Sequence, residues 1–186
     1  PAYSKCDMSK PHLMGVINLT PDSFFNNSKK KDYNSVQKTV KKMENHGASI
    51  IDIGGESTRP GSKIISTTEE QRRVIHIIQS LKQNNLKSLI SLDTRNFSTM
   101  KMGYENGVDI LNDISGFNNQ SKIEFISKNK IPIVLMHMQK EPKTMQDNPK
   151  YNFAPTDIYN FFSDKINELK SMGVDLGNIV IDPGIG

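Results

Sequence analysis

Short apolar runs alternate with longer amphipathic segments along most of the chain. Six runs have the length of strands, at residues 13–17, 50–53, 89–92, 109–111, 131–135 and 178–181. Between them, apolar residues recur at helical spacing, as in Val36, Val40 and Met43, and this segment ends at Gly47. The pattern therefore predicts strands and helices in regular alternation.

Two helix starts are predicted from side chains that can cap a helix. The stretch Thr68 to Gln71 matches a capping box, which makes Thr68 the expected cap of the helix that carries Val74 and Leu81. Thr156 is the expected cap of a later helix. That helix follows a long polar loop at residues 139–155 and would present Ile158, Phe162, Ile166, Leu169 and Met172 on one face.

Strands that are apolar on both faces and separated by helices indicate an α/β fold with a parallel sheet. Either an open doubly wound sheet or a (β/α)8 TIM barrel fits this pattern. An open sheet gathers its ligand at one switch point, whereas a barrel brings every strand end to one rim. All six predicted strands end in polar groups, which favours the barrel: Asn18, Gly54 to Arg59, Asp93, Asn112 with Asp113, His137 and Asp182.

A closed barrel needs eight units in typically ~250 residues, whereas this sequence of 186 residues holds about the first six. We therefore expect residues 1–186 to form a single incomplete barrel domain, the N-terminal three quarters of the whole. The first and sixth strands would then be exposed edges. This predicts a fragment, or the ordered part, of a longer protein that is poorly stable by itself.

Composition narrows the class of protein. A single cysteine, Cys6, excludes a disulfide framework and favours a reducing compartment, the cytoplasm. No apolar run approaches the roughly 20 residues that cross a membrane. The net charge is +4, but the lysines are scattered and no aromatic residues interleave with them, so we expect solvated surfaces and no nucleic-acid partner.

The predicted strand ends carry groups suited to an anionic, flat ligand. Gly54 and Gly55 would let the backbone turn sharply, and Arg59 can grip phosphate oxygens bidentately. The amide oxygen of Asn18 suits a hard cation such as Mg2+. Asp93, Asn112 and Asp182 would point into one cavity, where carboxylates and an amide can read the polar edge of a heterocycle.

Each of these residues alone is equally well explained as a turn former or a helix cap, and only their convergence from separate strands favours a binding site. The histidines are assigned no metal. His137 is predicted to be structural because it lies in a half-buried run, His76 to pack on a helix, and His46 to precede a helix-ending glycine.

Several motifs together resemble the dihydropteroate synthase family, the folate-pathway enzymes that sulfonamides target. The resemblance runs almost from end to end. It rests on MGVINLTPDSF at 14–24, IDIGGESTRPGS at 51–62, SLDT at 91–94, NDIS at 112–115, LMHMQKEPKTMQ at 135–146 and IDPGIG at 181–186. It implies a (β/α)8 barrel that condenses 6-hydroxymethyl-7,8-dihydropterin diphosphate with 4-aminobenzoate.

The resemblance also implies roles for individual residues. Asp22, Asn26 and Arg59 would be catalytic, with Arg59 contacting the diphosphate, and Asn18 would bind Mg2+. The pterin ring would lie against Asp93, Asn112, Met136 and Asp182, and the aminobenzoate pocket would be shaped by Phe24, Ser57, Thr58 and Pro60. The family further implies small-molecule substrates, a homodimer and possible fusion to another folate-pathway enzyme.

The sequence departs from the family in two places. The family has an aspartate in its first loop that is thought to stabilise a cationic pterin intermediate, and this chain has Asn26 there. The family also takes a lysine from strand seven and an arginine and a histidine from strand eight, which lie beyond this sequence. The first departure bears on the turnover rate of this chain more than on its fold or on pterin binding, whereas the residues of the second contact pterin, aminobenzoate and diphosphate in the family.

Three other functions remain open at this point. A related pterin-binding barrel could transfer a methyl group from a methylated folate to a corrinoid protein, although the loop with Arg59 argues for a diphosphate. A metal-dependent hydrolase is disfavoured because no His-x-His follows the first strand. A non-catalytic pterin-binding or partner-interaction protein is compatible with Asn26.

Overall fold

A computed structural model describes residues 9–20, 29–56, 65–137 and 151–185, and the statements below concern these residues. Six parallel strands form one sheet in the order of the chain. The strands are β1 (Leu13–Asn18), β2 (Ala48–Gly54), β3 (Leu89–Asp93), β4 (Ile110–Asp113), β5 (Ile133–Met136) and β6 (Ile179–Asp182). The helices are α1 (Lys29–Asn45), α2 (Thr67–Gln83), α3 (Phe97–Glu105), α4 (Gln120–Asn129), α5 (Ala154–Ser171) and the short 3-10 helix η2 (Leu176–Asn178).

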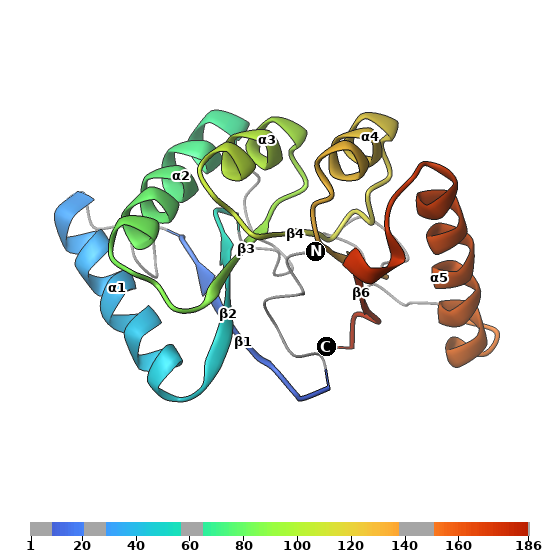
Figure 1. The fold of residues 1–186 in the computed structure, drawn as a ribbon, viewed down its shortest axis with the longest axis horizontal. Coiled ribbons are helices and arrows are strands. Elements are labelled where there is room, and N and C mark those ends of the chain that lie inside the picture. Colours follow the sequence, from blue (N-terminus) through green and yellow to red (C-terminus); the bar gives the residue numbers. More distant parts are fainter. Residues whose placement is uncertain (1–8, 21–28, 57–64, 138–150, 186) are drawn as a thin grey trace.

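The sheet is curled, and α1 to α5 follow one another along its outer, convex side (Figure 1). Neighbouring strands are consecutive in sequence, so every crossover adds one β/α unit on the same side. An open doubly wound sheet would reverse its strand order and place helices on both faces. The predicted barrel architecture is therefore confirmed for these six units.

The two faces of the sheet carry different apolar clusters. Ile51 and Ile53 of β2 are fully buried among the residues that pack between the sheet and the helices. Ile50, from the same strand, joins Ile110 and Val134 in a second, smaller cluster, with Leu89 and Val180 packed against it. Alternation along each strand thus separates an outer core from a concave inner face.

The structure corrects both predicted helix caps. α2 begins earlier than predicted, because Ser66 is its cap and accepts a hydrogen bond at 3.2 Å from the backbone N–H of Glu69. Thr156 lies inside α5. The first turn of that helix is held by Asp157, whose carboxylate accepts hydrogen bonds from the backbone N–H groups of Asn152 and Phe153. In both cases the prediction chose a threonine that lies two or three residues after the observed N-cap residue of the helix.

Among the described residues, no helix has both the length and the apolar character needed to span a bilayer. This finding agrees with the absence of a long apolar run in the sequence.

Candidate functional site

The carboxyl ends of the strands bring a row of polar residues onto the concave face. Asn18 pairs with Gly54, Gly54 with Asp93, and Asp93 with Asn112 in the strand registers, so these residues share one face of the sheet. On the far strands, Met136 pairs with Asp182 in the same way. The structure therefore places Asn18, Asp93, Asn112, Met136 and Asp182 along one rim of the curled sheet.

Gly54 keeps space open between two of these side chains. A Cβ atom on this residue would lie 3.0 Å from Oδ1 of Asn18 and 3.5 Å from Oδ2 of Asp93. The chain bends at Gly55 without a positive φ at either glycine, so backbone freedom is not what this position requires. The glycine at position 54 instead lets the amide of Asn18 and the carboxyl of Asp93 approach the same gap.

Asp52 belongs to this site although the sequence analysis did not select it. It lies on the concave face one step below Gly54, in register with Ser91, and is only 4% exposed. Nδ2 of Asn112 donates a hydrogen bond to its Oδ2 at 3.3 Å. An acidic residue inside the apolar run Ile50 to Ile53 was the signal that could have identified it.

Two oxygen atoms of this group accept no hydrogen bond within the part of the chain that the structure describes. They are Oδ1 of Asp52 and Oδ1 of Asn112, and both are buried. Buried acceptors without a donor are costly, by roughly 1–3 kcal/mol each. A ligand with several N–H groups on one edge would satisfy them.

Two acidic side chains on this face, Asp52 and Asp93, have pKa values above the usual value of an aspartate. Burial raises the pKa of Asp52, and the neighbouring side chains of Ser91 and Asn112 partly oppose that shift. Burial also raises the pKa of Asp93 well above 3.8, and the negative charge of Asp52 adds to the effect. Asp93 retains some exposed surface on the open concave face, where a ligand can reach it. The site therefore favours ligands that donate hydrogen bonds or carry positive charge.

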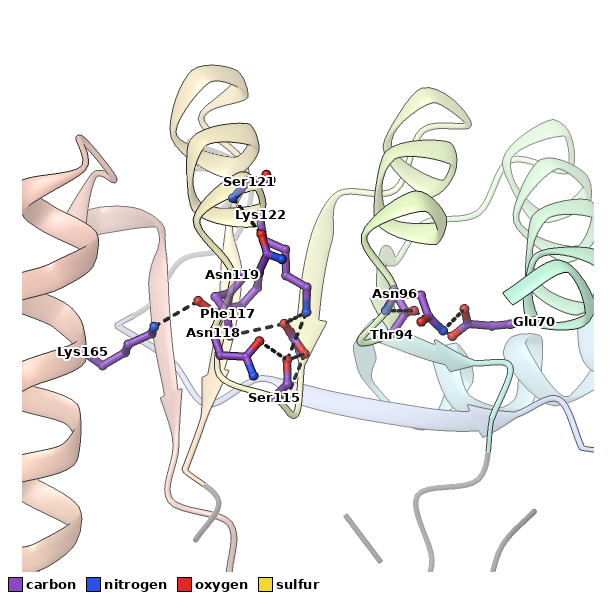
Figure 2. A network of polar contacts seen from close by, with 11 residues as sticks. Glu70, Thr94, Asn96, Ser115, Phe117, Asn118, Asn119, Ser121, Lys122 and Lys165 are labelled. Carbon is purple, nitrogen blue, oxygen red and sulfur yellow. Dashed lines mark hydrogen bonds and ion pairs between the residues drawn. The ribbon is translucent and has the colours of Figure 1, made fainter. Parts of the chain in front are cut away.

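The second polar residue at the end of β4 has a structural role. Asp113 is completely buried and faces away from the site, with its Oδ2 2.8 Å from Nζ of Lys122 and its Oδ1 2.6 Å from Oγ of Ser115. Figure 2 shows Lys122 extending from α4 toward Ser115 in this connection. The pair holds the β4–α4 connection, which leaves Asn112 as the residue of β4 that reaches the concave face.

The ends of β5 and β6 are joined through His137. Its backbone N–H donates to the carbonyl of Asp182 at 2.9 Å, and its ring packs edge-on against Phe161 with the centroids 4.9 Å apart. Burial lowers the pKa of the imidazole, although a hydrogen bond to the carbonyl of Pro183 opposes the shift. These contacts agree with the predicted structural role of His137. They also fix the turn in which the N–H of Gly184 donates to Oδ1 of Asp182 at 2.8 Å.

Seven predicted site residues lie outside the described residues: Asp22, Phe24 and Asn26 after β1, and Ser57, Thr58, Arg59 and Pro60 after β2. The neighbouring described residues show where both segments are attached. Leu19 donates its backbone N–H to the carbonyl of Gly54 at 2.8 Å. Glu56 accepts a hydrogen bond from the N–H of Ile65 and forms an ion pair with Arg95 at 3.1 Å. Both segments therefore leave the sheet at the rim that carries Asp93.

Comparison with known proteins identifies the family to which this chain belongs. The family model described as pterin binding enzyme matches residues 14–186. The dihydropteroate synthase of Escherichia coli K12 is 37% identical over 180 residues, covering 97% of this chain and 64% of its own length. That of Haemophilus influenzae Rd is 37% identical over 186 residues, covering 100% of this chain and 67% of its own length. This chain thus spans about two thirds of the length of these relatives.

Solved structures show the same fold. The Yersinia pestis dihydropteroate synthase in complex with a sulfonamide drug superposes with a TM-score of 0.84 and 36% identity, covering 97% of this chain and 65% of that one. The Burkholderia cenocepacia dihydropteroate synthase complexed with 7,8-dihydropteroate gives a TM-score of 0.80 and 33% identity, covering 95% and 59%. The similarity therefore extends over nearly the whole of this chain.

Proposed function

Because this chain belongs to the pterin-binding enzyme family, we propose that the protein is a dihydropteroate synthase. It condenses 6-hydroxymethyl-7,8-dihydropterin diphosphate with 4-aminobenzoate and releases diphosphate. The observation that carries the proposal is the row of Asn18, Asp93 and Asn112 on one rim, with Asp52 buried beneath it. The names of the curated relatives at 37% identity support the same reaction.

The acceptor atoms on the concave face suit a pterin ring. A pterin carries an amino group and ring N–H groups along one edge, which can donate to Oδ1 of Asp52 and Oδ1 of Asn112, two atoms that accept no hydrogen bond from the described residues. Asp93 on β3 and Asp182 on β6 add carboxyl oxygens. Raised pKa values at Asp52 and Asp93 match a ring that donates hydrogen bonds and gains positive charge during the reaction. Met136 supplies an apolar contact beside the ring.

The chemical step needs no nucleophile from the protein. The carbon–oxygen bond between the methylene carbon of the pterin and the diphosphate breaks first, which leaves a cationic pterin, and the amine nitrogen of 4-aminobenzoate then forms a bond to that carbon. The oxygen keeps the electron pair, and the amine loses one proton. The residues of this chain therefore act by binding, orienting and neutralising charge, with Arg59 assigned to the diphosphate and Phe24, Ser57, Thr58 and Pro60 to the aminobenzoate.

Asn18 is suited to hold Mg2+ near the departing diphosphate. Its amide oxygen borders the gap at Gly54. Among the described residues, no group of three or more His, Cys, Asp and Glu side chains could hold a metal by itself. The amide oxygen of Asn18 is a hard ligand that fits Mg2+, which takes few protein ligands and fills its shell with water and substrate phosphate oxygens. When bound, the ion would offset the negative charge that develops on the diphosphate.

Assembly and location follow from the same proposal. We infer a homodimer from the family resemblance, and a location in the cytoplasm, which the single cysteine supports. A fusion to another folate enzyme is a further possibility to test, because the folate synthesis bifunctional protein of Arabidopsis thaliana is 36% identical and this chain covers 38% of it. Light scattering on the full-length protein distinguishes a monomer from a dimer.

The reaction itself is tested by diphosphate release from the full-length protein. Release should require both the pterin diphosphate and 4-aminobenzoate, and the product should have the mass of 7,8-dihydropteroate. Pterin binding without turnover would point to a non-catalytic pterin-binding protein. Methyl transfer from a methylated folate, without diphosphate release, would replace the proposal with a methyltransferase.

A further inference from the structure

Glu70 lies in the first turn of α2 and is only 1% exposed, although it carries a carboxyl group. Its two oxygens accept three hydrogen bonds, two from the β3–α3 connection and one from the first turn of α3. Oε1 accepts from Oγ1 of Thr94 at 2.7 Å, and Oε2 accepts from Oγ1 of Thr99 at 2.6 Å and from Nδ2 of Asn96 at 2.9 Å. Figure 2 shows the Glu70 side chain directed at Thr94 and Asn96.

These partners are the residues that follow Asp93. Thr94 is the next residue, and its backbone N–H donates to the carbonyl of Asn112 at 3.0 Å. Asn96 is the N-cap residue of α3, yet its side chain makes no capping hydrogen bond. Its amide instead donates a hydrogen bond to Glu70. Glu70 therefore determines where the chain goes as it leaves β3, immediately beside two predicted pterin ligands.

Arg73, one turn further along α2, reaches the other two strand ends. It is 7% exposed, and its Nη1 donates to the carbonyl of Gly55 at 3.0 Å and to the carbonyl of Leu19 at 3.4 Å. Leu19 directly follows Asn18, and Gly55 directly follows Gly54. The helix is also pressed against this point, since a Cβ on Gly55 would lie 2.9 Å from Cγ of Glu70.

We propose that Glu70 and Arg73 are positioning residues for the pterin and diphosphate site. From the outer side of the sheet, the buried start of α2 fixes the relative placement of the ends of β1, β2 and β3. Those ends carry Asn18, Gly54 and Asp93, so the spacing of the site depends on two residues that act through the backbone and through Thr94. The inference rests on the proposed function for the identity of the ligand.

The chemistry of the contacts explains why charged residues are placed here. Burying a carboxylate among neutral donors costs free energy, because the charged group loses its contact with water. An apolar residue at this position would pack the helix on the sheet without that cost. The carboxylate and the guanidinium differ from an apolar residue because their hydrogen bonds are directional. Their hydrogen bonds to particular side chains and backbone carbonyls hold the strand ends in one arrangement, which an apolar contact would not specify.

The test compares Glu70→Gln and Arg73→Lys with a matched control, Glu105→Gln, in the full-length protein. Glu105 is an exposed glutamate at the opposite end of α3. Each variant is measured for pterin affinity, urea unfolding and amide hydrogen exchange at Thr94 and Leu19. We expect the two test variants to bind a pterin diphosphate about tenfold more weakly and to exchange these amides faster, with the control unchanged.

A merely structural role would lower the stability of the folded protein and leave the affinity of its folded fraction intact, and that result would overturn the proposal. If Glu70→Gln does not fold, Thr99→Val removes one of the three donors and keeps the charge, and about a threefold loss of affinity is expected. If the wild-type protein binds no pterin, the proposed function fails. Amide exchange in the ligand-free variants still decides the positioning role, since unchanged exchange at Thr94 would overturn it.

Discussion

Asn112 of β4 donates a hydrogen bond to Asp52 of β2, two strands away, with 3.3 Å between Nδ2 and Oδ2. Adjacent strands lie about 4.8 Å apart, so strands with one neighbour between them are roughly 9.6 Å apart in a flat sheet. The contact passes over Ser91 of β3, and both side chains extend toward each other on the concave face. Residues from separate strands thus meet in one polar centre.

Replacing Asp52 with asparagine tests whether this centre reads the pterin ring. We expect Asp52→Asn to weaken pterin binding about tenfold, because one strong acceptor is lost. Unfolding in urea at neutral pH should require no less denaturant than for the wild type, since a buried carboxyl is removed. Asp164→Asn on the exposed side of α5 is the control. Unchanged affinity in a folded Asp52→Asn protein would exclude Asp52 from the site.

The raised pKa of Asp93 predicts a specific pH dependence of stability. The folded protein holds this proton more tightly than the unfolded chain, so the contribution to stability is complete below 3.8 and is lost as pH rises through the folded pKa. Asp93→Asn removes the titration. The free energy of unfolding of the variant minus that of the wild type should therefore increase from about pH 4 upward and then level off. A gain of the wild type over the variant in the same range would show that the pKa is lowered.

Gly54→Ala should disturb the diphosphate side of the site. The added Cβ would lie 3.0 Å from Oδ1 of Asn18, which is tighter than an ordinary contact and displaces the amide. We expect a larger loss of affinity for the pterin diphosphate than for the pterin alcohol without diphosphate. Gly177→Ala is the control, because its Cβ would meet the nearest atom at an ordinary 3.4 Å. Equal losses for both ligands would argue against a role of Asn18 at the diphosphate.

Asn26→Asp restores the acidic residue that the family has in its first loop. Position 26 lies outside the described residues, so this prediction rests on the sequence resemblance. A carboxylate close to a cationic pterin intermediate would lower its energy, and we expect kcat to rise by about tenfold with little change in pterin affinity. Steady-state kinetics measures both. An unchanged kcat would show that this loop does not approach the ring as it does in the family.

The order of strands and the polar strand ends could be predicted from sequence because both are local patterns. The face on which each residue lies follows from strand parity, which separates Asn112 from the adjacent Asp113. Asp52 was missed because the run Ile50 to Ile53 indicated a strand buried on both faces. The acidic residue within that run was the one available signal, and it marks an unusual position without telling on which face of the strand the site lies.

Contacts between residues far apart in the chain could not be predicted from the sequence. Glu70 looked like part of a capping box, and nothing in its neighbours indicated that its carboxyl would meet Thr94 and Thr99 across a helix pair. Similarly, Gly55 was explained by a turn, whereas its tight contact with Glu70 depends on how α2 docks. These features arise from packing between units, which local patterns do not encode.

The concave rim is proposed to bind a pterin through Asp52, Asp93 and Asn112. The most direct measurement is calorimetric titration of the full-length protein with 6-hydroxymethylpterin diphosphate, for the wild type, Asn112→Ala and the exposed control Asn160→Ala. We predict that wild type and control bind equally and that Asn112→Ala binds at least about tenfold more weakly while unfolding cooperatively. Equal affinity for all three proteins would contradict the account, because the ligand would then bind somewhere other than this rim.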